Sequence, residues 1–170
     1  MDFLASLRLV APELLLSVQG LILLLAAAWS GTTAARAMSV IAVGVLVAAA
    51  FMVAPALCAG ASGIDTAAFG EQFRADAFAS YAKLLIYGTA AAALMIAPGF
   101  FDRYGAMRAE YPVLILFAAL GMSMMVSATD LLTLYIGLEL NSLAAYVLAS
   151  FLRTDDRSAE AGLKYFVLGA

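Results

Sequence analysis

Glu139 is the residue of this 170-residue chain whose surroundings most strongly suggest chemistry. It stands nine positions into an apolar run of 22 residues, 131–152. A carboxylate at the middle of a bilayer costs at least about 2.5–3.5 kcal/mol, so it must face protein or water, find a cation or bind a proton. On a helix, Tyr135, Ser142 and Tyr146 form one polar stripe with it. The pattern predicts a group that takes up and releases protons; the alternative is a carboxylate that fixes helix packing.

Lys164 is the second candidate, 25 residues after Glu139 and inside another apolar run. The polar residues 153–157 suit a tight turn, so the two runs would be antiparallel neighbours. Spacing alone leaves two placements open. The lysine stem can extend back to the membrane interface, or the ammonium can turn inward and exchange protons.

Lys83 is a third charge within an apolar run, seven residues beyond Asp76. Asp76 is suited to cap the helix that carries this lysine. We expect a structural role for Lys83, in which it extends to the outer interface or pairs with Asp76 or Glu71. Glu13 stands near the start of the first apolar run, where the positive end of a helix dipole favours an acid.

The elements that must position these residues are membrane helices. A spanning helix needs about 20 mostly apolar residues. Leucine, alanine and valine runs of that kind recur along the chain, and we see one helical membrane domain rather than several domains. The candidate spans are 9–29, 38–57, 77–97, 112–128 and 131–152, with a sixth run at 158–170 that is incomplete. The fold class is therefore all-α, a polytopic transmembrane helix bundle.

Composition supports the same class and excludes others. The chain is 65% hydrophobic and 12% charged, and its mean hydropathy is +1.01. This composition argues against a soluble enzyme, a disordered tail and a nucleic-acid binder. With no histidine and one cysteine, Cys58, we expect no metal, haem or iron–sulfur site in this chain. Any redox energy that drives transport would come from partner subunits.

The sixth run and the basic residues bear on extent and orientation. Thirteen residues are too few to cross the hydrocarbon, so we expect this run to continue in a longer chain rather than to be re-entrant. If the spans alternate, one face collects two arginines and the other collects five: Arg36, Arg103, Arg108, Arg153 and Arg157. Basic residues favour the cytoplasmic side, so the N-terminus is predicted to lie outside.

Two segments carry a resemblance to a known family. Residues 127–148 read S-A-T-D-L-L-T-L-Y-I-G-L-E-L-N-S-L-A-A-Y-V-L, and residues 157–170 read R-S-A-E-A-G-L-K-Y-F-V-L-G-A. These segments resemble the antiporter-like membrane subunits of respiratory complex I, the NADH–quinone oxidoreductase. The earlier segments A-P-E-L-L-L at 11–16 and A-D-A-F-A-S-Y-A-K at 75–83 resemble the subunit N group more than its sister groups.

The resemblance implies a fold with inverted five-helix repeats, of which this chain would hold three leading helices and the start of the first repeat. It implies that Glu139 is the family's proton-pathway glutamate and that Lys164 is the lysine of its L-K-Y motif, both part of a proton relay. The flavin, iron–sulfur clusters and quinone would belong to partner subunits, with no cofactor in this chain. The implied partners are the other membrane-arm subunits and the lipid bilayer, in a hetero-oligomer of the bacterial inner membrane.

The sequence therefore predicts a proton-translocating membrane-arm subunit, coupled to electron transfer from NADH to quinone in partner subunits. Two alternatives remain. One is a subunit of a multisubunit cation/proton antiporter, and the other is a structural membrane-arm subunit that carries no protons.

Overall fold

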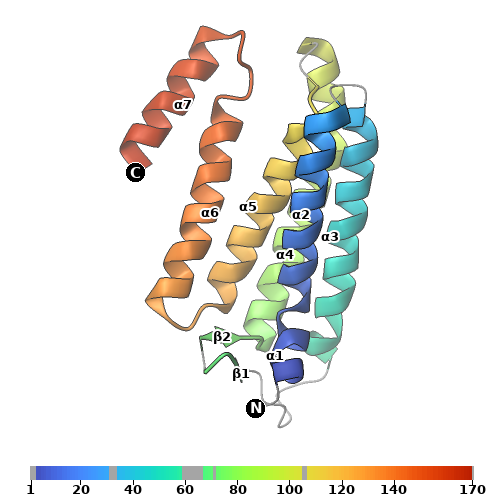
Figure 1. The fold of residues 1–170 in the computed structure, drawn as a ribbon, viewed down its shortest axis with the longest axis vertical. Coiled ribbons are helices and arrows are strands. Elements are labelled where there is room, and N and C mark those ends of the chain that lie inside the picture. Colours follow the sequence, from blue (N-terminus) through green and yellow to red (C-terminus); the bar gives the residue numbers. More distant parts are fainter. Residues whose placement is uncertain (1–2, 31–33, 59–66, 71, 105–106, 170) are drawn as a thin grey trace.

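The computed structural model describes residues 3–30, 34–58, 67–70, 72–104 and 107–169, and they form an all-α membrane bundle (Figure 1). Most of the described chain is helical, and it also contains two short strands. The helices are α1 (Phe3–Leu9), α2 (Ala11–Ser30), α3 (Ala35–Cys58), α4 (Ala77–Tyr104), α5 (Glu110–Ser127), α6 (Leu131–Ala149) and α7 (Asp156–Gly169). The strands are β1 (Ala67–Ala68) and β2 (Phe73–Arg74), which pair antiparallel.

Five of these helices, α2 to α6, are long and apolar enough to cross a membrane. The predicted run 9–29 is divided, because α1 ends at Leu9 and α2 begins at Ala11. The segment 98–111, which lies between the candidate spans 77–97 and 112–128, is helical as far as Tyr104, since α4 continues through Pro98. The ring of Phe101 packs on Tyr111 and Phe151, and this contact holds the last turns of α4 against the neighbouring helices.

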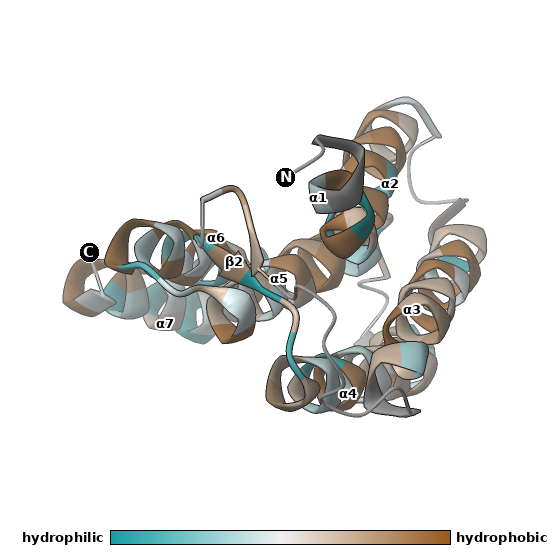
Figure 2. Ribbon diagram, turned by 90° about the horizontal axis from the view of Figure 1, so that it is seen from below, coloured by the Kyte–Doolittle hydropathy of each residue, from teal (hydrophilic) through white to brown (hydrophobic). Residues whose placement is uncertain are grey.

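Helix α5 lies between α6 and the group formed by α2, α3 and α4 (Figure 2). The largest apolar core is built from α2 to α5, and its fully buried residues include Leu16, Leu46, Leu94 and Leu116. The α5–α6 contact is closer, because glycines meet there. A Cβ added at Gly121 would lie 2.6 Å from the carbonyl oxygen of Gly137.

The chain alternates between two ends of the bundle. At one end, β2 lies beside the turn between α5 and α6, where the Thr129 backbone N–H donates to the Gln72 carbonyl oxygen at 3.2 Å. At the other end, Arg36 of α3 donates to Asp102 of α4 at 2.7 Å. The N-terminal helix α1 and the two strands share the first end (Figure 1).

Candidate functional site

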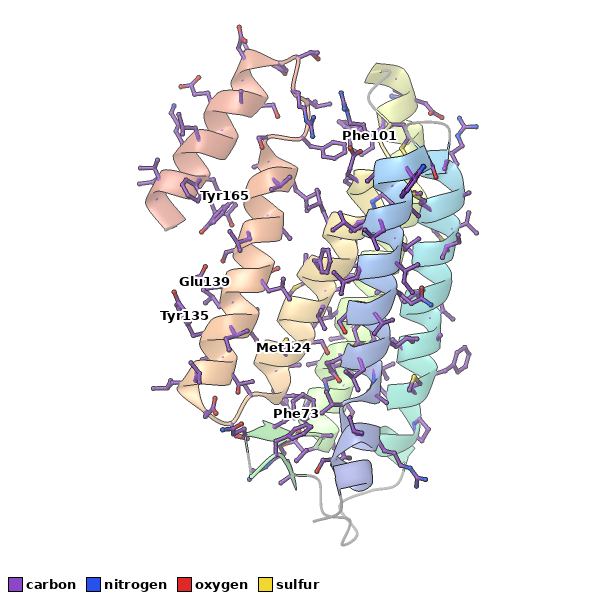
Figure 3. The ribbon with its side chains drawn as sticks, viewed as in Figure 1. Phe73, Phe101, Met124, Tyr135, Glu139 and Tyr165 are labelled. Atoms are coloured by element: carbon purple, nitrogen blue, oxygen red, sulfur yellow. The ribbon has the colours of Figure 1, made fainter. Side chains whose placement is uncertain are left out.

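Glu139 lies near the middle of α6, half-buried. Asp130 caps this helix, since its carboxylate accepts the backbone N–H of Thr133 at 2.5 Å. The Tyr135 hydroxyl, one turn earlier on the same face of the helix, is the polar group that interacts with the Glu139 carboxylate, and Tyr135 is 59% exposed. Both side chains point from α6 to the side opposite α5 (Figure 3).

The polar stripe of α6 therefore faces away from the α2–α5 bundle. The opposite face, with Gly137 and Ala144, is buried against α5. Helix α7 covers the far end of the stripe, where the Tyr146 ring packs edge-on against Tyr165 at 4.9 Å. Tyr146 is buried, while the middle of the stripe at Glu139 and Ser142 is only partly covered by the described residues.

Lys164 lies on the exposed face of α7. Its Nζ is 2.6 Å from Oε1 of Glu160, one turn earlier, and 68% of its side chain is exposed. The described ion pairs do not join Lys164 to Glu139. The spacing predicted that the two residues lie on neighbouring antiparallel helices, and α6 and α7 are such neighbours. The two charged groups nevertheless interact with different side chains, Lys164 with Glu160 and Glu139 with Tyr135.

Lys83 is not where the sequence predicted it. Its Nζ lies 2.7 Å from Oε1 of Glu13, and 3% and 5% of these side chains are exposed, so the lysine neither extends to the interface nor pairs with Asp76. Asp76 instead caps α4 as predicted, accepting the Ala79 N–H at 2.7 Å. Glu71, the other expected partner, is outside the described residues. Those two placements were wrong because they considered the interface and an acid near in sequence. In the bundle α2 and α4 both pack on α3 and α5, and the ion pair crosses between them to an acid 70 positions away.

The Glu13–Lys83 pair continues into two buried hydroxyl groups. Ser123 of α5 donates its hydroxyl to Oε1 of Glu13 at 2.5 Å, and the Tyr87 hydroxyl of α4 lies 2.7 Å from Ser123 Oγ. The ring of Phe73 covers the ammonium, with Nζ 4.6 Å from its centroid. We call Glu13, Lys83, Tyr87 and Ser123 the buried network.

Sequence reasoning missed the buried network as a site. Two signals were available: Lys83 and Tyr87 are four residues apart on one helix face, and Glu13 is an acid in an apolar run. Neither signal identifies the third helix. A buried ion pair contributes little net stability over an apolar pair, yet removing one partner costs about 3–5 kcal/mol. The network therefore joins α2, α4 and α5 through groups that depend on one another.

The described residues contain no group of three or more histidine, cysteine, aspartate or glutamate side chains arranged for a metal ion. The acid, base and hydroxyl groups on the two sites are instead those that bind and pass protons.

Known proteins resemble this chain along its whole length. NADH-quinone oxidoreductase subunit N of Erythrobacter litoralis is 66% identical over 170 residues, which cover 100% of this chain and 35% of the relative. The proteins of that name from Rhizorhabdus wittichii and Rhodobacter capsulatus are 58% and 46% identical, over 100% and 98% of this chain and 34% of each relative. Over nearly its whole length the chain is therefore similar to part of each of these NADH-quinone oxidoreductase N subunits.

A family model described as NADH:quinone oxidoreductase/Mrp antiporter, TM, matches residues 128–170, the segment that holds Glu139 and Lys164. That description names both oxidoreductases and antiporters, whereas the relatives reported above are named as oxidoreductase subunits. With its five apolar helices, the chain is a multi-pass membrane protein. It spans about a third of the length of the curated relatives that it matches.

Proposed function

We propose that this chain is part of a membrane-arm subunit that moves protons while partner subunits pass electrons from NADH to quinone. The observation that carries the proposal is the half-buried Glu139 in the middle of α6, within the matched segment 128–170. The names of the relatives support the reaction, since they are subunits of NADH-quinone oxidoreductases.

In this proposal Glu139 takes up a proton, and the Tyr135 hydroxyl orients the carboxylate. Low-dielectric surroundings favour the neutral acid, whereas a nearby cation favours the carboxylate. A lysine that approaches or withdraws therefore changes the proton affinity of Glu139. We assign this role to Lys164 among others. Its present partner Glu160 holds it weakly, because an exposed ion pair is worth about 0–1 kcal/mol.

The redox cofactors of the proposed complex belong to partner subunits. Flavin, iron–sulfur clusters and quinone are assigned to other complex I subunits, and none to this chain. We place the assembled protein in the bacterial inner membrane with its N-terminus on the periplasmic side. The five arginines that the sequence assigns to one side of the membrane support this orientation, by the rule that basic residues stay on the cytoplasmic side.

Replacing Glu139 with glutamine in the full-length subunit, within its complex, tests the proposal. A proton-transfer group contributes about 10²–10⁴-fold to the rate of its step. We therefore expect fewer protons moved per NADH in membrane vesicles, while the complex still assembles and oxidises NADH. Glu110→Gln, an acid in the first turn of α5, is the matched control and should leave the ratio unchanged. Undiminished pumping in the Glu139→Gln complex would contradict the proposal.

A second candidate is a subunit of a multisubunit cation/proton antiporter, because the description of the matching family model names Mrp antiporters as well. Sodium-dependent proton exchange by the purified complex, without NADH, would support this alternative. Co-purification of hydrophilic NADH-oxidising subunits would support the oxidoreductase.

A further inference from the structure

The buried network is a second group of proton-binding side chains, separate from Glu139. It lies on the α2, α4 and α5 helices at the end of the bundle where the strands lie, whereas Glu139 is on the far side of α6 (Figures 1 and 3). Lys83, Glu13, Ser123 and Tyr87 follow one another at 2.7, 2.5 and 2.7 Å. Each step is short enough for a proton to pass along a hydrogen bond.

A pocket of about 110 Å³ lies beside this network, and its lining extends from Lys83 to Arg8. Lys83 and Ser80 of α4 line it together with Pro12 of α2 and Met52 of α3, and Arg8 of α1 is at its exposed rim. A pocket of this size has room for several water molecules, provided that polar groups hold them. The lysine ammonium and the serine hydroxyl supply such groups.

Two oxygens next to the network lack a partner among the described residues. Oε2 of Glu13 and Oγ of Ser127 are both buried without a hydrogen bond. Ser127 is one helical turn from Ser123, on the same face of α5. Buried polar groups are nearly always satisfied by protein or by ordered water. The free carboxylate oxygen is therefore a position for water or for an added proton.

We propose that the buried network is a second proton-exchange site of the subunit, in which Glu13 is the proton acceptor and Lys83 the group that faces the water of the pocket. This inference rests on the proposed function for the use of the proton, though not for its binding. No residue of this network lies in the segment that the family model matches.

The exchange adds one proton to a neutral pair. Lys83 passes a proton from its ammonium to Glu13, which becomes a neutral acid. A hydronium ion from the pocket then returns a proton to the lysine amine and leaves as water. The pair thus changes from one positive and one negative group to one positive group and a neutral acid. The hydroxyls of Ser123 and Tyr87 both donate and accept, so they can carry the proton further into the bundle.

Other charges near the pair influence this step. Arg8 at the rim of the pocket disfavours an added positive charge, and Asp76, which caps α4, favours it. Among the described residues that line the pocket, α3 contributes only apolar side chains, Met52, Val53 and Ala56. Arg8 is therefore the one other charged residue among the described residues that line the pocket.

The competing interpretation is that the ion pair only holds three helices together. A variant that removes both charges distinguishes this interpretation from proton exchange, since apolar residues can replace a buried ion pair without loss of stability. We choose Glu13→Leu with Lys83→Met in the full-length subunit within its complex. Arg36→Gln with Asp102→Asn is the matched control, because it removes the other described ion pair between helices.

Two quantities are measured: the protons moved per NADH in membrane vesicles, and the infrared spectrum of the purified complex between acid and alkaline pH. We expect the double variant to move fewer protons per NADH and to lose a pH-dependent carboxylic-acid band present in wild type and in the control. An assembled double variant with an unchanged ratio and an unchanged spectrum would overturn the proposal.

If the double variant does not assemble, Tyr87→Phe tests the proposal, because it removes one hydroxyl of the buried network and leaves the ion pair in place. It should lower the ratio of protons to NADH, whereas Tyr111→Phe, a tyrosine outside the network, should not. Equal ratios in the two complexes would then overturn the proposal. Failure of the Glu139 proposal is distinguishable, because it shows as normal pumping in Glu139→Gln together with a defect in the Glu13 variants.

Discussion

Two acids in apolar helices have different surroundings in this molecule. Glu13 is fully enclosed and meets a lysine at 2.7 Å, whereas Glu139 is half-buried and meets a tyrosine hydroxyl on the same helix. The sequence alone draws attention to Glu139, because it is an acid in the middle of an apolar run. It did not identify Glu13, whose position near a helix start has a simpler explanation, the helix dipole. Its partner Lys83 is identified only by the three-dimensional arrangement, in which α2 and α4 both pack on α5.

Single and double replacements of the buried pair should differ in stability. Lys83→Met alone leaves the Glu13 carboxylate buried without a cation, which costs about 3–5 kcal/mol. We expect less assembled complex and a lower thermal midpoint for this variant. Adding Glu13→Leu should restore both, measured by native gel and by thermal unfolding of the purified complex. A Lys83→Met complex as stable as wild type would contradict a buried charged pair.

At the scale of elements, hydropathy was sufficient to find the helices but not to pair them. Runs of about 20 apolar residues follow from the thickness of the bilayer, so the positions of α2 to α6 could be read from sequence. Pro98 suggested an earlier end to α4, yet the helix continues because Phe101 and Asp102 have partners beyond the proline. Nearly every face of these helices is apolar, so periodicity does not indicate which face meets which neighbour.

The α5–α6 contact depends on small residues, and this gives a prediction. A Cβ at Gly137 would lie 2.8 Å from the Gly121 carbonyl oxygen, so the helices must separate to accept alanine. We expect Gly137→Ala to cost about 1–3 kcal/mol, the usual range for overpacking. Gly88→Ala is the control, because its Cβ would meet nothing within 4 Å and alanine favours a helix by about 0.5–1 kcal/mol. Equal thermal midpoints for the two variants would contradict the close contact.

At the scale of the whole molecule, the distribution of charge follows the alternation of the helices. The connections at the α1 end carry Arg8 and Arg74, and the opposite end carries the five arginines counted from sequence. Arg36 and Asp102 join α3 and α4 at that second end. The direction of insertion depends on the chain as a whole, because the basic residues of all its connections are counted together for each side of the membrane.

Cysteine labelling tests the proposed orientation. Gln72 lies at the α1 end and Thr154 in the turn between α6 and α7 at the other end, and both side chains are exposed. In a Cys58→Ser background, a membrane-impermeant maleimide should label Gln72→Cys in right-side-out vesicles and Thr154→Cys in inverted vesicles. The physical reason is that arginine crosses a bilayer at high cost, so the end richer in arginine stays in the cytoplasm. Reversed labelling would place the mouth of the Lys83 pocket on the cytoplasmic side. That result would contradict the proposed orientation.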